Sequence, residues 1–415
     1  MFKVTREFIK NALKKEGTIT DFAIDNLCEI GENYTSNLDL VKFNLSEIEG
    51  RTESFNIIVK YPNTNSFFYT TIVMMNGYKK ETCMYRNLIP DATQWQMDAF
   101  GEVKHPFPVA HAHYCSEEDD VIIMENLNEK GYHILPRQVG RSFEECKIIM
   151  ETIAVFHGIL IAYSQTFESD EAFIEKYPFI KSLPKEQLQQ MMEPPDRVEQ
   201  NKSFIGLLIE ILKNKYANDM DLLDKYYKYA LSTKVVKNMY MYMTSNDEFN
   251  VLCHGDLWNN NTMFCMDSEN IESCKLIDLQ IIKFCSPAVD VAHFIWLSAS
   301  TDVIRNNRKE LVEIYYTALQ KVTSELNCDL KFSFEQLWNH FEGFYECSLY
   351  QAIMAGLTMF APKDQSLDAN VKSDEAENPM ENLVQKFKQL METANENILS
   401  RVVSLIKIGS ELNIY

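Results

Sequence analysis

The segment Val251–Phe264, VLCHGDLWNNNTMF, constrains this chain more than any other stretch of its sequence. Its polar residues stand between two short apolar runs, and a simple turn needs only one or two such residues. His254 precedes Asp256 by two residues, and Asn261 follows Asp256 by five. We therefore expect the three side chains to form a site rather than a mere turn.

A second acid downstream fits the same site. Asp278 ends the apolar run CKLI and follows Asn261 by 17 residues. A strand, a turn and a returning strand fit in that interval, so Asp278 can lie beside Asn261. Mg²⁺ prefers few protein oxygen ligands together with phosphates and water. One amide and one carboxylate meet that demand, which makes Asn261 and Asp278 candidate Mg²⁺ ligands.

The spacing of His254, Asp256 and Asn261 is that of the protein-kinase catalytic loop, H-R-D-x-x-x-x-N. In that template the aspartate accepts the proton of the attacking hydroxyl and the asparagine binds Mg²⁺. The alternative is a capped turn with an unrelated acid at a strand end. Because all four residues occur together and in order, the pattern favours Asp256 as a general base.

Two residues upstream are candidates for binding ATP. Lys60 ends the apolar strand run IIVK, where its ammonium could reach phosphate oxygens. Glu81 lies on the helix expected next and could pair with Lys60, as the corresponding kinase residues do. Taken alone, Lys60 could instead be a surface lysine, and Glu81 could be a solvated acid on a helix.

A loop over the phosphates is less clearly marked, because the chain has neither G-x-G-x-x-G nor a Walker sequence. Residues 29–36, EIGENYTS, offer the best candidate. Gly31 permits a tight turn, and the amides and hydroxyls that follow, as far as Ser36, could face phosphates.

The connection between the two halves of the chain is a further candidate contact for ATP. The apolar run that ends at Met124 predicts a buried strand, and Glu125 and Leu127 follow it. Backbone groups there could hydrogen-bond the edge of an adenine. An ordinary linker is the alternative.

The length and the apolar patterns predict a chain in two lobes. At 415 residues the chain exceeds what one hydrophobic core usually serves. Strand patterns run from about residue 29 to residue 123, and helical spacing dominates from Phe143 onward. We predict an α+β chain with a small antiparallel-sheet lobe (1–124) and a larger, mostly helical lobe (125–415), joined by a hinge at about 124–128.

Individual elements can be placed approximately. Expected strands are 38–43, 55–60 and 120–124, with a hairpin loop at 47–51 and strand signals again at 250–283. Expected helices are 78–88, 143–164, 204–243, 308–326, 333–359 and 378–409, and the N-terminal 17 residues also show helical spacing. The polar, acidic stretch 362–379 reads as a loop.

Composition excludes some partners. The net charge of −20, from 60 acids and 40 bases, disfavours nucleic acid and an anionic membrane surface as partners. The N-terminus lacks the continuous apolar core of a signal peptide, and we find no uninterrupted apolar run of 18 residues. We therefore expect no membrane partner and a cytoplasmic location.

The ten cysteines do not suggest a zinc site or a disulfide scaffold. No CxxC pair occurs, and the four cysteines between 253 and 285 are separated by 12, 9 and 11 residues. Those gaps do not match zinc-knuckle spacing, and most of the cysteines stand in apolar runs. Buried thiols are the better interpretation.

Eight short stretches, taken together and in order, resemble the insect ecdysteroid kinase-like family, also described as CHK kinase-like. That family lies within the choline kinase and aminoglycoside phosphotransferase branch of the protein kinase-like fold. The stretches are ENYTS (32–36), IIVK (57–60), ETCMY (81–85), IMENL (123–127), AVFHG (154–158), CHGDLWNNNTMF (253–264), LIDLQ (276–280) and SPAVDVAHF (286–294). The last hundred residues carry no motif that can be matched.

The resemblance implies ATP- and Mg²⁺-dependent phosphorylation of a small-molecule hydroxyl. It assigns the base to Asp256, the metal ligands to Asn261 and Asp278, and the phosphate contact to Lys60. His254 would brace the loop.

The resemblance also implies supporting roles. Asp290 would hold the loop by hydrogen bonds, and His157 of AVFHG would be structural. Leu279 departs from the IDFQ run usual in the family, and the loss of the aromatic ring would alter packing under the metal loop.

The acceptor and the activity itself leave alternatives. An ecdysteroid or another secondary alcohol is the first expectation; a cationic acceptor of the choline or aminoglycoside type would require acids or an aromatic cage. A catalytically silent pseudokinase that only binds ligand is a second alternative. Protein kinase activity is disfavoured because neither DFG nor APE follows Asp278.

Overall fold

The computed structural model describes most of the chain. The described residues are 2–27, 35–46, 51–66, 68–181, 195–232, 244–246, 248–267, 270–361, 385, 388–394 and 396–415. The expected hairpin loop at 47–51 and the acidic stretch 362–379 lie outside them, apart from Arg51. Parts of the expected helices 204–243 and 378–409 also lie outside.

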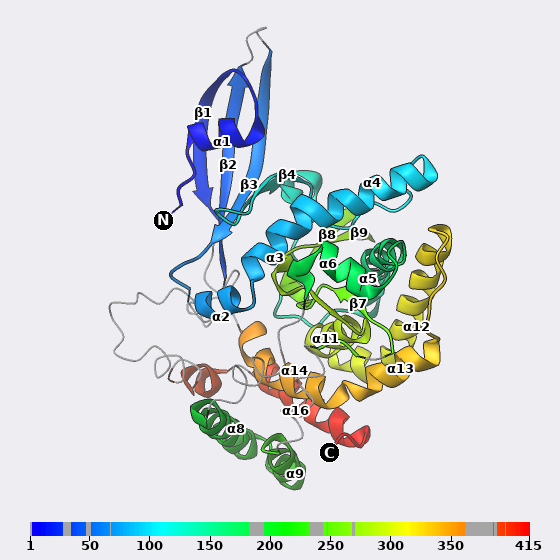
Figure 1. Cartoon of the computed structure of the whole chain (residues 1–415). Helices are drawn as coiled ribbons and strands as arrows, with labels where there is room; N and C mark the ends of the chain where they lie inside the picture. Colours follow the sequence, from blue (N-terminus) through cyan, green and yellow to red (C-terminus); the bar gives the residue numbers. More distant parts are fainter. Residues whose placement is uncertain are drawn as a thin grey trace.

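The N-terminal lobe is an antiparallel sheet of five strands, in the order β1-β2-β3-β5-β4. The strands are β1 (Thr18–Asn26), β2 (Ser36–Ser46), β3 (Thr52–Pro62), β4 (Ala112–Ser116) and β5 (Val121–Glu125). The helix α1 (Arg6–Leu13) lies against this sheet (Figure 1). Ile9 of α1 packs with the inward side chains of β2, β3 and β5, among them Val41, Val59 and Ile123.

Strand β1 was not predicted. Its side chains are almost all exposed or half-buried, and Ile19 alone is buried, so no apolar alternation marks the segment. Pairing with β2, from Thr18 opposite Ser46 to Asn26 opposite Asp39, makes it a strand. The register shifts between Thr20 and Ala23, where Asp21 adopts a φ of 49°.

Helices connect β3 to β4 and extend toward the second lobe (Figure 1). They are α2 (Tyr69–Met74), α3 (Gly77–Cys83), a π-helical turn (Met84–Leu88) and α4 (Ile89–Phe100). The helix expected at 78–88 is therefore confirmed, and it continues as far as Phe100.

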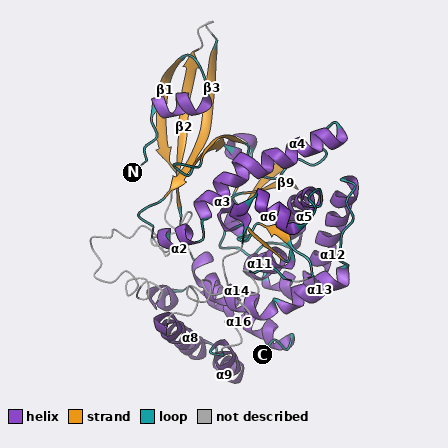
Figure 2. Cartoon of the chain, viewed as in Figure 1, coloured by secondary structure: helices purple, strands orange, loops and turns teal. Residues whose placement is uncertain are grey.

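The second lobe is mostly helical, as Figure 2 shows. Its helices are α5 (Phe143–Ser164), α6 (Asp170–Lys176), α8 (Pro195–Lys215), α9 (Met220–Ala230), α11 (Ala288–Ser298), α12 (Thr301–Glu325), α13 (Phe334–Gly343), α14 (Tyr345–Met359) and α16 (Glu396–Glu411). Helix α5 begins with a capping box formed by Ser142 and Glu145. It packs against α12 within the core of the lobe.

Helix α5 is long and apolar enough to cross a membrane by length and composition. In the structure, 72% of its most apolar 18-residue window is buried inside the protein. Burial in the core therefore accounts for its apolar character.

Short strands inside the helical lobe carry the loop of interest. Strand β7 (Val251–Cys253) pairs with β10 (Lys283–Cys285), and β8 (Thr262–Asp267) pairs with β9 (Asn270–Leu276) and with β6 (Tyr132–His133). The predicted fold, an α+β chain with an antiparallel-sheet lobe and a larger helical lobe, is confirmed.

Candidate active site

The loop between β7 and β8 turns sharply at Gly255, where φ is +84°. A Cβ atom at this position would lie 2.0 Å from the carbonyl oxygen of Ile281 and 2.8 Å from its carbonyl carbon. Glycine is therefore required both by the left-handed backbone and by the close approach of the neighbouring chain.

The side chain of Asp290, in the first turn of α11, holds this loop through the backbone N–H groups of the loop. Its Oδ2 accepts from the N–H of His254 at 2.6 Å, and its Oδ1 accepts from the N–H of Gly255 at 2.8 Å. His157 Nε2 lies 3.1 Å from Asp290 Oδ2, and His157 Nδ1 lies 2.8 Å from the hydroxyl of Tyr315. Burial by itself would raise the pKa of Asp290. Hydrogen bonds from His157 and from the N–H of Gly255 outweigh the effect of burial and hold the pKa of Asp290 at about 2.

His254 ties the loop to the chain just after β9. Its Nε2 lies 3.0 Å from the carbonyl oxygen of Ile277, and its Nδ1 accepts from the N–H of Asp256 at 3.3 Å. A carbonyl can only accept and an N–H can only donate, so His254 is neutral with its proton on Nε2. The imidazole therefore braces Asp256 against the chain that leads to Asp278.

Asn261 and Asp256 are joined directly. The Nδ2 of Asn261 donates to the backbone oxygen of Asp256 at 2.7 Å and to its Oδ2 at 3.0 Å. Because both partners are acceptors, the amide nitrogen must face them and Asn261 Oδ1 must point away. Burial favours a raised pKa for Asp256. The interaction with His293 and the hydrogen bond from Asn261 outweigh the effect of burial, and the pKa of Asp256 is lowered.

Asp278 meets the two residues predicted in the N-terminal lobe. Lys60 Nζ, on β3, lies 2.7 Å from Glu81 Oε2 and 2.9 Å from Asp278 Oδ1. Glu81 Oε1 also accepts from the backbone N–H of Leu279 at 3.1 Å. Burial would lower the pKa of Lys60, but the charges of Asp278 and Glu81 raise it well above its ordinary value. Lys60 is therefore a buried cation between two acids.

Gln280 extends this cluster to the start of β2. Its Nε2 donates to Ser36 Oγ at 2.6 Å and to Glu81 Oε2 at 3.3 Å, and its Oε1 accepts from Thr35 Oγ1 at 2.8 Å. Ser36 is fully buried, so it contacts Gln280 beneath the surface of the site. Gly31 lies outside the described residues.

The segment predicted to be the hinge begins at the end of β5, at Glu125. The N–H of Glu125 donates to the carbonyl oxygen of His111, and Glu125 Oε1 accepts from the N–H of His111, both at 2.9 Å. Its other carboxylate oxygen pairs with Lys130. Leu127 is buried and begins a 3-10 turn. The carboxylate and the N–H of Glu125 are thus engaged with the protein itself, so the other backbone groups of this connection are the candidate contacts for a nucleotide.

One polar residue beside Asp256 was not singled out from the sequence. His293 of α11 places its Nε2 3.7 Å from Asp256 Oδ1, and its Nδ1 lies 3.3 Å from Oε1 of Gln351 on α14. His293 stands within the stretch SPAVDVAHF, three residues after Asp290, so the two residues share one side of α11. This helical spacing from Asp290 is the sequence signal that could have identified His293.

A family model matches most of the chain. The model described as the ecdysteroid kinase-like family matches residues 30–328, which is 299 of 415 residues. The chain belongs to the ecdysteroid kinase-like family. A search of curated proteins found no match. The residues of the site, from Lys60 to His293, lie within the matched range, whereas α13, α14 and α16 of this ecdysteroid kinase-like protein lie beyond it.

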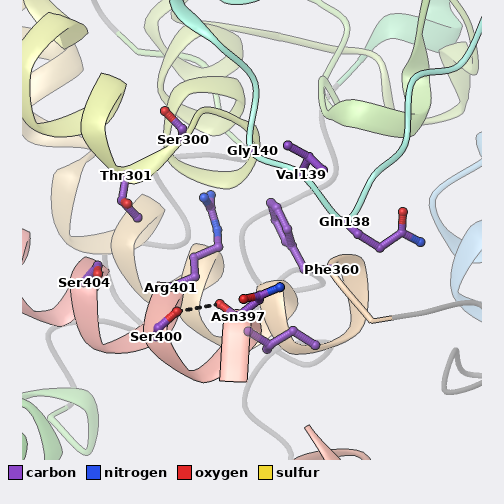
Figure 3. Close-up of a pocket in the computed structure, with 11 residues that line it drawn as sticks. Gln138, Val139, Gly140, Ser300, Thr301, Phe360, Asn397, Ser400, Arg401 and Ser404 are labelled. Atoms are coloured by element: carbon purple, nitrogen blue, oxygen red, sulfur yellow. Dashed lines mark hydrogen bonds between the residues drawn. The ribbon is translucent and has the colours of Figure 1, made fainter. Parts of the chain in front are cut away.

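A cavity of about 370 Å³ lies elsewhere, between the 138–140 segment, the start of α12 and α16 (Figure 3). Arg401 extends into this region and donates to the carbonyl oxygens of Trp296, Leu297 and Ala299 at 2.9 to 3.4 Å. It therefore satisfies the carboxyl end of α11. The lining residues in the described part of the chain include none of the site residues named above.

A second cluster lies behind the loop. The ligand atoms of His157, Cys253 and Asp290 lie within 4.8 Å of one another, and all three residues are buried. Both oxygens of Asp290 already accept hydrogen bonds from the loop, and Cys253 Sγ lies 3.4 Å from the carbonyl oxygen of Ser286. These contacts make the cluster a support for the loop rather than a metal centre.

Proposed function

We propose that this ecdysteroid kinase-like protein is a small-molecule kinase that uses ATP and Mg²⁺ to phosphorylate an alcohol. A secondary alcohol of the ecdysteroid type is the first candidate acceptor. The observation that carries the proposal is the position of Lys60 between Glu81 and Asp278, at 2.7 and 2.9 Å. It is joined by Asp256 and Asn261, which have the spacing of a kinase catalytic loop. That set of residues has the parts needed for phosphoryl transfer.

The residues fit a nucleotide with Mg²⁺. Asn261 turns its amide nitrogen toward Asp256, which leaves Oδ1 for a cation, and Asp278 offers a carboxylate. These are hard oxygen donors of the kind that Mg²⁺ takes alongside phosphates. When bound, Mg²⁺ neutralises charge that develops on the phosphate oxygens.

The remaining residues perform the binding and the proton transfer. Lys60, held by Glu81, contacts phosphate oxygens of ATP, and backbone groups at Glu125 and Leu127 bind the adenine edge. Asp256 orients the acceptor hydroxyl and accepts its proton as the oxygen attacks the γ-phosphorus. The bond from that phosphorus to the bridging oxygen breaks, and ADP leaves. The hinge at about 124–128 joins the nucleotide-binding lobe to the acceptor-binding lobe.

The net charge of −20 disfavours nucleic acid and an anionic membrane surface as partners. A cytoplasmic location is part of the proposal.

A phosphorylation screen tests the function. The protein is incubated with Mg-ATP and a panel of ecdysteroids, other steroid alcohols and plant-metabolite alcohols, and products are detected by mass spectrometry. We expect at least one alcohol to gain one phosphoryl group. Asp256→Asn should lower kcat by about 10²-fold or more while the thermal shift with Mg-ATP is kept.

Asp267→Asn, which changes an exposed acid at the end of β8, is the matched control and should leave kcat unchanged. Full turnover in Asp256→Asn would contradict the assigned base. A clear Mg-ATP shift without transfer to any alcohol would instead support a ligand-binding pseudokinase.

A further inference from the structure

The two oxygens of Asp256 have different surroundings. Oδ2 accepts from Asn261 Nδ2 at 3.0 Å, whereas Oδ1 faces His293 Nε2 at 3.7 Å. The side chain of Asp256 is 35% exposed and that of His293 is 12% exposed. An acceptor hydroxyl that reaches the oxygen not held by Asn261 therefore arrives beside the imidazole of His293.

The orientation of His293 determines which nitrogen can exchange a proton. Its Nδ1 lies 3.3 Å from Oε1 of Gln351, and an amide oxygen only accepts hydrogen bonds. Nδ1 therefore carries a hydrogen in both protonation states, and Nε2 is the nitrogen that gains or loses its proton. Gln351 thus directs the basic nitrogen of His293 toward Asp256.

The fold places His293 beside the catalytic loop that carries Asp256. Asp290, three residues before His293 on α11, binds the backbone N–H groups of His254 and Gly255 at 2.6 and 2.8 Å. One helix therefore holds the loop that carries Asp256 and also presents the imidazole to that side chain.

We propose that His293 is a positioning residue that acts through Asp256, orienting its carboxylate and receiving the proton that the carboxylate takes from the acceptor. This inference rests on the proposed kinase function. The acceptor oxygen bonds to the γ-phosphorus as the bond to the bridging oxygen of ADP breaks. The acceptor proton passes to Asp256 Oδ1 and from there to His293 Nε2. The imidazolium then releases the proton to water, and the carboxylate is restored.

The separation of 3.7 Å is longer than a hydrogen bond, and such catalytic contacts commonly tighten when substrate binds. Transfer within a fixed pair removes the need for the weakly basic carboxylate to hold the proton until it meets solvent.

Kinetics of a double-mutant cycle provide the first test, with the alcohol identified in the screen as acceptor. His293→Gln should lower kcat about 10- to 100-fold and change KM for ATP little, the range found for residues that orient a reacting group. Gln351→Leu should also lower kcat, but by a smaller factor than His293→Gln. His133→Gln, an exposed histidine on β6, is the control and should leave kcat unchanged.

The double variant Asp256→Asn/His293→Gln separates this role from general damage to the structure. If His293 acts through Asp256, the double variant should be no slower than Asp256→Asn alone. Losses that multiply, or a wild-type kcat in His293→Gln, would overturn the proposal.

Histidine ring NMR tests the geometry without any acceptor, so it can be read even if no alcohol is phosphorylated. In ¹⁵N-histidine-labelled protein above about pH 8, where an ordinary imidazole is neutral, His293 should be protonated on Nδ1. Its resonances, assigned with His293→Gln, should shift in Asp256→Asn while those of His133 stay in place. Protonation on Nε2, or no response to Asp256→Asn, would overturn the proposal independently of the kinase function.

Discussion

At the level of single residues, Gly255 shows how one missing Cβ shapes the site. Two glycines of this chain have nearly the same left-handed backbone, with φ of 84° at Gly255 and 77° at Gly101. A Cβ at Gly255 would meet the backbone of Ile281 at 2.0 Å, whereas in the part of the chain that the structure describes a Cβ at Gly101 would meet nothing within 4 Å. The pair therefore separates backbone strain from steric overlap.

We predict that Gly101→Ala lowers the free energy of unfolding by about 1 kcal/mol, the cost of the left-handed conformation alone. Gly255→Ala should lower it by more, about 3 kcal/mol or beyond, because the loop or the Ile281 chain must also move. Urea denaturation of both variants measures the difference. Equal losses would show that the approach of Ile281 is not a constraint.

Asp290 predicts a response to acid. Its pKa is about 2 in the folded protein against 3.8 as the ordinary value, so the folded state favours the ionised carboxyl. The stabilisation is therefore complete above about pH 4 and is lost as the pH falls from 4 toward 2, by about 2 kcal/mol. In Asp290→Asn, stability measured by urea denaturation should fall less steeply over this range. An unchanged slope would contradict the prediction.

At the level of elements, the packing of α5 against α12 depends on Gly158. A Cβ at this position would lie 2.6 Å from Val322 Cγ1 and 2.9 Å from Val322 Cβ, so the two helices approach through the missing side chain. Gly356 is a matched comparison, because it also lies inside a helix, α14, but no atom of the described residues lies within 4 Å of an added Cβ.

We predict opposite effects for the two substitutions. Gly158→Ala should destabilise the protein by about 1–3 kcal/mol through overpacking. Gly356→Ala should stabilise it by up to about 1 kcal/mol, because alanine has the higher helix propensity. Thermal denaturation of both variants checks this. A stabilised Gly158→Ala protein would show that α12 can move away at little cost.

At the level of the whole molecule, the contacts of Lys60 and Gln280 join segments far apart in the chain. Lys60 on β3 meets Asp278, 218 residues later, and Thr35 meets Gln280, 245 residues later. These polar contacts connect the N-terminal sheet to the chain that follows the catalytic loop, so the nucleotide-binding residues depend on how the lobes sit together.

Lys60→Met should weaken both stability and nucleotide binding. Removal of the cation leaves Glu81 and Asp278 without their shared partner, a loss of about 3 kcal/mol for a buried pair. The thermal shift caused by Mg-ATP should also be largely lost. Lys79→Met, on the exposed side of α3, is the control and should retain both. A normal shift in Lys60→Met would remove Lys60 from the phosphate site.

The sequence alone determined the fold class, most of the helices and the local part of the site. Asp256 and Asn261 are five residues apart in one loop, so their spacing alone brings them together, and Lys60 and Glu81 are 21 residues apart within the N-terminal lobe. Apolar patterns predicted the strands β2, β3 and β5. β2 and β3 alternate in part because one face is buried, whereas β5 is a continuous apolar run because it is buried along most of its length.

Only the tertiary structure decided the contacts between distant segments. Strand β1 carries no apolar alternation and exists because β2 pairs with it. His293 reaches Asp256, and Gln280 reaches Ser36, through the packing of α11 and of the two lobes, 37 and 244 residues apart in sequence. Periodicity records which face of an element is buried, whereas the partner of a polar side chain depends on which elements the core brings together.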